Sequence, residues 1–144
     1  MAPQIDPDRL RLALPKGRMQ EGVQRLLADA SIEVRAVERS YRPRICLPGV
    51  EVKILKPQNI VEMLAVGSRD AGFAGADWVA ELGVELVELL DTGLDPVRVV
   101  AAAPRALLSR DGKLPDGRLV VASEYERLTR GWLDSRKIDA SFVR

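Results

Sequence analysis

Near its N-terminus the chain changes from a two-residue to a helical apolar repeat, and Pro15-Lys16-Gly17 separates the two patterns. Residues 9–14 alternate as RLRLAL, which predicts a strand with its leucines on one face. Residues 19–30 place apolar side chains three and four positions apart, which predicts an amphipathic helix. A strand that leads through a short break into a helix is the basic unit of α/β proteins.

This alternation continues along the chain. We predict further strands at 32–37, 51–55, 71–74, 86–90, 97–103, 119–122 and 140–143, and helices at 58–66, 77–82 and 124–136. Strands followed by helices favour an α/β fold with a largely parallel sheet. The regular alternation of strands and helices is interrupted at the predicted bend Thr92–Pro96. We therefore predict a first α/β lobe at 1–95 and a partial second lobe at 96–144.

The predicted second lobe is small. Its two or three strands and one helix are marginal for an independent core. The chain also stops on a predicted strand, where a covering helix is usual. We therefore expect these 144 residues to be part of a longer protein.

Composition excludes several classes of function. The chain has no histidine, which removes Ser-His and Cys-His triads and histidine-ligated metal sites. A net charge of +1 argues against a nucleic-acid-binding surface. Cys46 is the only cysteine, and no apolar run approaches the roughly 18 residues of a membrane span. With no signal-peptide pattern at the N-terminus, we expect a soluble, cytoplasmic protein.

Two basic motifs are candidates for binding phosphate. Lys16-Gly17-Arg18 follows a predicted strand and precedes a helix, where glycine permits close backbone approach and helix N–H groups attract anions. Arg39, Arg42 and Arg44 cluster around Tyr41 and could clamp a polyphosphate through paired hydrogen bonds. Each motif is equally readable as solvated cations in an ordinary turn or loop.

Two further motifs have structural alternatives. In the segment 67–77, glycines lie on both sides of a predicted strand, so it does not match a dinucleotide fingerprint. There, Asp70 could orient a sugar hydroxyl or an adenine group, and Asp77 could be a plain N-cap. Ser123 and Glu126 have the spacing of a capping box, although Tyr125, Thr129 and Arg130 could face a cleft between lobes.

Taken in order, these segments resemble the catalytic region of ATP phosphoribosyltransferase, the first enzyme of histidine biosynthesis. The resemblance extends over about residues 9–143 and is carried by seven segments: LALPKGRM (12–19), RPRI (42–45), VKILKPQNIVEML (52–64), GSRDAGFAGADWV (67–79), LVELLDTG (86–93), VRVVAAAP (97–104) and VVASEYERLTR (120–130). It implies the two-lobed type II periplasmic-binding-protein fold, here incomplete, with the substrates between the lobes.

The resemblance also implies a reaction. The family condenses ATP with phosphoribosyl pyrophosphate, releases pyrophosphate, and uses Mg²⁺ together with the substrates. A homo-oligomer and a possible regulatory subunit are implied as well. By the match, Arg18 and Arg42 are the pair that stabilises pyrophosphate across a dimer interface. The implied substrate-binding residues are Lys16, Gly17, Lys56, Asp70, Gly75 and Asp77.

The chain departs from the family pattern at several positions. Lys56 and Asn59 stand where the family usually has arginine and aspartate, so the bidentate fork and an acceptor charge are lost. The loop that binds the ribose 5-phosphate follows residue 144 in family order. We therefore expect a phosphoribosyltransferase whose given portion is inactive alone. The alternative is a non-catalytic ligand-binding or regulatory module of the same fold.

Overall fold

The computed structural model describes residues 6–35 and 41–144. The chain forms two compact units, Met1–Pro96 and Val97–Arg144, which are described separately below. Arg39, one of the three arginines predicted to clamp a polyphosphate, lies outside the described residues, as does the end of the predicted strand 32–37.

Unit 1 is built on a parallel sheet of three strands in the order β4-β1-β5. These strands are β1 (Leu10–Pro15), β4 (Val50–Leu55) and β5 (Ala71–Gly72). Three helices follow them: α1 (Arg18–Asp29), α2 (Pro57–Ala65) and α3 (Ala76–Leu82). A short antiparallel pair, β2 (Val34–Arg35) with β3 (Arg44–Ile45), lies between α1 and β4 along the chain. The predicted α/β fold with a parallel sheet is confirmed.

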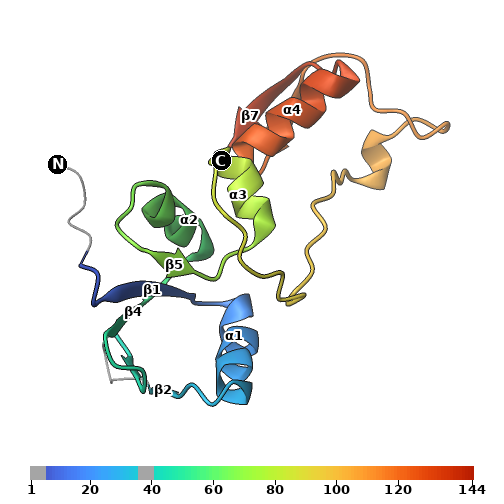
Figure 1. The fold of residues 1–144 in the computed structure, drawn as a ribbon. Coiled ribbons are helices and arrows are strands. Elements are labelled where there is room, and N and C mark those ends of the chain that lie inside the picture. Colours follow the sequence, from blue (N-terminus) through green and yellow to red (C-terminus); the bar gives the residue numbers. More distant parts are fainter. Residues whose placement is uncertain (1–5, 36–40) are drawn as a thin grey trace. The chain divides into compact units, whose positions relative to one another are not determined.

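The two long helices of unit 1 cover opposite faces of the sheet (Figure 1). On one face, Leu12, Leu14 and Val52 form a buried cluster with Val23 and Leu27 of α1. On the other face, Ala13 of β1 and Gly72 of β5 lie close to Ile60 of α2. This division follows from the two-residue period of a strand, which directs alternate side chains to opposite faces.

On the α2 face, the backbone of β5 comes very close to its neighbours. A Cβ placed on Gly72 would lie 2.7 Å from Cγ2 of Ile60 and 3.2 Å from Cβ of Ala13. Ile60 and Ala13 are both fully buried. Glycine at position 72 therefore allows α2 to seat on the sheet, because no side chain fits between them.

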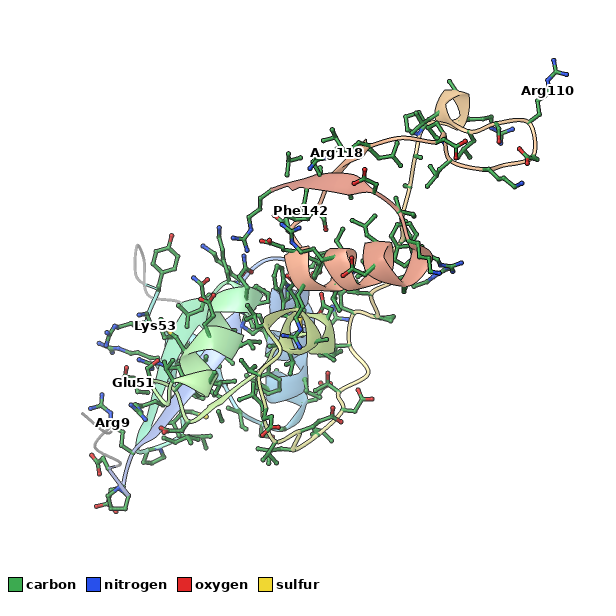
Figure 2. All side chains as sticks on the ribbon, turned by 90° about the horizontal axis from the view of Figure 1, so that it is seen from above. Arg9, Glu51, Lys53, Arg110, Arg118 and Phe142 are labelled. Carbon is green, nitrogen blue, oxygen red and sulfur yellow. The ribbon has the colours of Figure 1, made fainter. Side chains whose placement is uncertain are left out.

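Unit 2 contains a parallel pair of strands and one covering helix. The pair is β6 (Leu119–Ala122) with β7 (Ala140–Val143), and the helix α4 (Glu126–Arg136) connects them. A 3₁₀ turn, η1 (Arg105–Leu107), precedes an exposed loop. Figure 2 shows Arg110 at the tip of this loop, in agreement with the predicted surface connection at 110–117. Only Leu133 of α4 is buried in this unit.

Two predicted strands do not form. Residues 86–90 and 97–103 are described throughout, but they are irregular and make no backbone–backbone hydrogen bond to other described residues. Val87 and Leu89 are 84% and 85% exposed. Their apolar pattern suits a strand, but a strand also needs a neighbour that supplies backbone partners, and the described residues provide none.

The predicted capping box of Ser123 and Glu126 does not form, and Asp77 is not an N-cap. Helix α4 starts at Glu126, so Ser123 is not its N-cap; the Ser123 hydroxyl accepts a hydrogen bond from the Tyr125 amide instead (3.0 Å). Glu126 forms an ion pair with Arg130 one turn along the helix. Helix α3 starts one residue before Asp77, and Gly75 is its N-cap. Among the described residues, no helix has the length and apolar character needed to cross a membrane.

Candidate functional site

The carboxyl ends of β1 and β4 form the part of the sheet best placed to bind a ligand. These strands pair in parallel along their whole length, ending with Pro15 beside Leu55. The chain leaves β1 toward α1 on one face and leaves β4 toward α2 on the other. In open α/β sheets, neighbouring strands whose connections diverge in this way leave a crevice at their carboxyl ends, where ligands bind.

Two lysines follow these paired strand ends directly. The amide of Lys16 donates a hydrogen bond to the carbonyl of Leu55 (2.9 Å), which continues the ladder by one residue. Lys56 is the exposed N-cap residue of α2. The Lys16 ammonium lies 5.2 Å from the centre of the Tyr41 ring, within the range of a cation–π contact. The edge therefore carries positive charge from both strands.

Gly17 shapes the backbone between β1 and α1. Its φ of 84° and ψ of −143° lie in a region that side chains disfavour strongly. A Cβ built on Gly17 would meet nothing within 4 Å, so the space above this peptide is open. Gly17 is also the N-cap of α1 and has no side chain to cap the helix. The turn thus presents accessible backbone at a helix N-terminus, an arrangement that favours anions.

Arg18, the first residue of α1, is held by a carboxylate from a distant part of unit 1. Its Nε and Nη2 donate to the two carboxylate oxygens of Asp95, at 3.0 and 2.6 Å. The Arg18 side chain is 70% exposed and that of Asp95 29%. This is the paired geometry with which arginine binds carboxylates and phosphates.

Gly75 and Asp77 follow β5 at the same edge of the sheet, because β5 runs parallel to β1. A Cβ on Gly75 would lie 2.1 Å from Oδ1 of Asp77, so the carboxylate folds back over the start of α3. A side chain at position 75 would displace this carboxylate.

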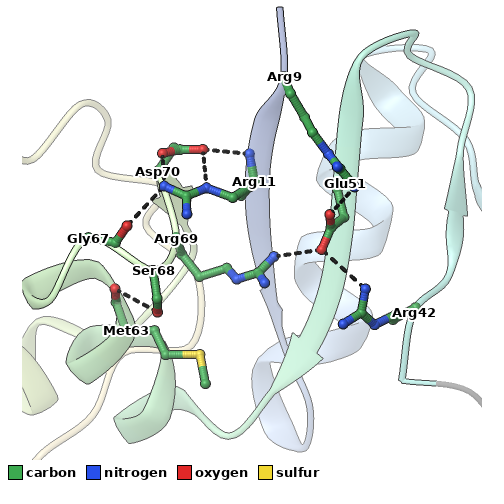
Figure 3. Close-up of polar contacts among 9 residues, drawn as sticks. All are labelled: Arg9, Arg11, Arg42, Glu51, Met63, Gly67, Ser68, Arg69 and Asp70. Carbon is green, nitrogen blue, oxygen red and sulfur yellow. Dashed lines mark hydrogen bonds and ion pairs between the residues drawn. The ribbon is translucent and has the colours of Figure 1, made fainter. Parts of the chain in front are cut away.

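Asp70 lies apart from these residues. It precedes β5, and its amide donates to the Arg11 carbonyl near the amino end of β1 (2.9 Å). Its carboxylate accepts hydrogen bonds from the Arg11 amide (2.7 Å), Nε (3.0 Å) and Nη2 (2.7 Å) (Figure 3). These bonds and the charge of Arg11 lower the pKa of Asp70 to about 2. The structure therefore gives Asp70 a partner within the fold and does not place it with Lys16.

Arg42 belongs to a different cluster, centred on Glu51 of β4. Arg9, Arg42 and Arg69 all pair with the Glu51 carboxylate (Figure 3), with Nη1 of Arg42 at 3.4 Å and Nη1 of Arg69 at 3.2 Å. Burial alone would raise the pKa of Glu51, but the Arg69 hydrogen bond and the three positive charges lower it below its ordinary value. The structure thus places Arg42 with Glu51 and Arg18 with Asp95.

Six of the predicted site residues follow strand ends at one edge of the sheet: Lys16, Gly17, Arg18, Lys56, Gly75 and Asp77. Sequence reasoning did not find the ion-pair partners in this unit. It missed the acidic partners Asp95 and Glu51, and it missed Arg11. These pairs join residues 77, 9 and 59 positions apart. The Asp70 carboxylate gives no local signal of its partner, since ion pairs of this kind depend on strand register.

A parallel sheet covered by helices on both faces, with cations at its carboxyl edge, defines an α/β protein suited to binding an anionic ligand. Comparison with known proteins identifies the family. The family model "HisG: ATP phosphoribosyltransferase" matches residues 56–144, more than half of the chain. The chain therefore belongs to the ATP phosphoribosyltransferase family.

Individual relatives agree. The chain is 31% identical over 137 residues to the ATP phosphoribosyltransferase of Chlorobium phaeovibrioides, covering 92% of this chain and 46% of that protein. It is 29% identical over 142 residues to the enzyme of Moorella thermoacetica, covering 94% of this chain and 62% of the relative. The chain thus spans about half the length of the curated relatives it matches.

Among solved structures, the chain is similar to one from the ATP phosphoribosyl transferase (HisG:HisZ) complex of Thermotoga maritima. The TM-score is 0.69 at 19% sequence identity, and the match covers 93% of this chain and 63% of the other. This likeness confirms the fold expected from the sequence, the periplasmic-binding-protein type, in partial form.

Proposed function

We propose that the chain supplies the phosphate-binding and adenosine-binding part of an ATP phosphoribosyltransferase. The whole enzyme would condense ATP with phosphoribosyl pyrophosphate to give phosphoribosyl-ATP and pyrophosphate. The observation that carries this proposal is the cationic edge at the ends of β1 and β4, found in a chain that belongs to this family. The relatives named above are all transferases, so the non-catalytic alternative is not favoured.

The proposed reaction needs no nucleophile from the protein. Adenine N1 attacks ribose C1, the new N1–C1 bond forms, and the C1–O bond to pyrophosphate breaks, with the bonding electrons leaving on the pyrophosphate oxygen. What the protein must supply is alignment of the two substrates and compensation of the charge that grows on the leaving group. A chain without histidine can supply both.

The candidate residues at the carboxyl edge each have a role in this scheme. Lys16, the Gly17 backbone and Arg18 would bind phosphate oxygens at the start of α1. Lys56 would add charge from the neighbouring strand end, and Asp77, seated over Gly75, would lie on the adenosine side.

Two other predicted residues receive different roles. We assign Asp70 to the fold, because Arg11 already engages both of its carboxylate oxygens. For Arg42 we keep the role that the family resemblance implies, stabilising pyrophosphate from the other subunit of a dimer. In its own unit it pairs with Glu51.

Mg²⁺ would enter this scheme as part of the substrates. In phosphate chemistry it is usually held by one or two carboxylates and the substrate phosphates. In the described portions of the chain, no three acidic, cysteine or histidine side chains converge to form a metal site. The side chains at the carboxyl edge are mainly cationic, and they fit the oxygens of a magnesium-bound phosphate group better than the bare ion.

We further propose a homo-oligomer, with a regulatory subunit as a possible partner. The similar chain from Thermotoga maritima was solved as a HisG:HisZ complex, which supports an assembly in general terms. A cytoplasmic location is consistent with a single, unpaired cysteine, Cys46.

Calorimetric titration of the 144-residue chain with ATP, and separately with phosphoribosyl pyrophosphate, tests the proposal. We expect ATP to bind and the second substrate to bind weakly or not at all, because about half of the relatives' length is not matched. Lys16→Ala should weaken ATP binding, whereas Arg25→Ala, on an exposed position of α1, should not. A folded chain that binds neither substrate would contradict the proposal.

A further inference from the structure

The ion pair between Arg18 and Asp95 occupies one of the two guanidinium edges through which arginine binds phosphate in a paired manner. Both oxygens of the Asp95 carboxylate accept from one edge of the Arg18 guanidinium, through Nε and Nη2. Arginine binds phosphate in the same paired manner. A carboxylate and a phosphate group cannot both take this edge at once, so they compete for it.

Asp95 is brought to this position by a segment anchored on α1. Leu94 packs against the buried core of unit 1, and its side chain lies on α1 beside Gly22, where an added Cβ would be 3.5 Å from Leu94 Cδ2. The preceding turn is closed by the Gly93 amide, which donates to the Asp91 carboxylate (2.9 Å). Residues 91–95 are therefore anchored on α1 through Leu94. Asp95 lies directly before Pro96, the last residue of unit 1.

The backbone of Asp95 has an unusual conformation. Its φ of 48° is positive, a conformation that aspartate and asparagine tolerate better than other residues with a side chain. Asparagine at this position would keep the backbone and the side-chain shape while removing the negative charge. The substitution Asp95→Asn therefore tests the effect of the negative charge separately from the backbone conformation.

We propose that Asp95 is an internal competitor for the anion site: its carboxylate holds Arg18 until a pyrophosphate group displaces it. This rests on the proposed function, because it takes Lys16-Gly17-Arg18 as the phosphate site. The ion pair suits such an exchange, since it is partly open to solvent and pairs of this kind are weak. Asp95 is thus a positioning residue that sets the affinity for the anion. Ligand binding releases the end of the segment 91–95 from Arg18.

The test is titration of the 144-residue chain with inorganic pyrophosphate. Asp95→Asn should bind pyrophosphate about two- to fivefold more tightly than the wild type, the range expected when a partly exposed ion pair no longer competes. Arg18→Ala should abolish most of the binding. Glu21→Gln is the matched control, because Glu21 pairs with Arg25 on the same helix at 2.8 Å and should leave pyrophosphate affinity unchanged.

Tighter binding is a result that a purely structural role for Asp95 would not produce. If Asp95→Asn does not fold by circular dichroism, Asp95→Gly also accepts the positive φ and carries the same expectation. If the wild type binds pyrophosphate and neither Asp95 variant binds it more tightly, the proposed competition is overturned, although the phosphate site is retained. An equal increase in Glu21→Gln would also overturn it, as a general effect of charge. Absence of binding in the wild type and both Asp95 variants would overturn the phosphate site and the competition together.

Discussion

The fork between Arg11 and Asp70 gives the sharpest test of whether Asp70 serves the fold or the ligand. Asp70→Asn keeps one carbonyl acceptor but removes the charge and turns an N–H group toward the guanidinium. The pKa of Asp70 falls from an ordinary 3.8 to about 2 because of Arg11. Taken alone, this difference corresponds to about 2.4 kcal/mol of folding free energy. The Asp70 side chain is 28% exposed, so solvent screens the pair, and we expect a loss of about 1 kcal/mol.

Urea unfolding followed by circular dichroism would measure this loss. The contribution of Asp70 should be fully present above about pH 5, because the carboxyl is then ionised in both the folded and the unfolded chain. It should disappear as the pH falls toward 2, since the unfolded chain takes up the proton first. The difference between wild type and Asp70→Asn should therefore be about 1 kcal/mol at pH 7 and shrink between about pH 5 and pH 2.

The control is Glu33→Gln, which removes the carboxylate of an exposed pair with Arg35 in the same unit. We expect little change in stability from it. The reasoning would be refuted if Asp70→Asn left the free energy of unfolding unchanged at pH 7 while ATP binding fell. That result would return Asp70 to the ligand site.

Three further predictions concern the sheet, its carboxyl edge and the two arginines assigned to pyrophosphate. Gly72→Ala should lower the free energy of unfolding by about 1–3 kcal/mol, because its Cβ would lie 2.7 Å from Ile60 Cγ2. Combined with Ile60→Ala, it should cost clearly less than the sum of the two single changes, and additive costs in urea unfolding would argue against the contact. Gly17→Ala should cost about 1–3 kcal/mol through its φ of 84° and should weaken ATP binding in calorimetry; unchanged stability would contradict the backbone argument. In the full-length enzyme, Arg18→Ala and Arg42→Ala should slow turnover more than they weaken ATP binding, and steady-state kinetics with unchanged turnover for both would reject those roles.

Local patterns in the sequence determined much of the architecture. The alternation at 9–14 and the helical repeat at 19–30 produced β1 and α1 with shifts of one residue, and the predicted strands at 119–122 and 140–143 have the observed bounds. These elements form where predicted because apolar periodicity, glycine and proline act over a few residues. The order of strand ends and helices also placed Lys16, Gly17 and Lys56 at one edge, since the carboxyl ends of parallel strands share an edge.

Tertiary structure decided what depends on a neighbour. The segments 86–90 and 97–103 have the composition of strands, but a strand exists only where another strand satisfies its backbone groups. Likewise, the charges of Arg18 and Asp70 could be read from the sequence, but their partners could not. Asp95 reaches Arg18 because Leu94 packs on α1, and Arg11 meets Asp70 because β5 pairs with β1 in one register. Periodicity is a local property of the chain, whereas ion pairs and strand pairing depend on which distant segments the fold brings within a few ångströms.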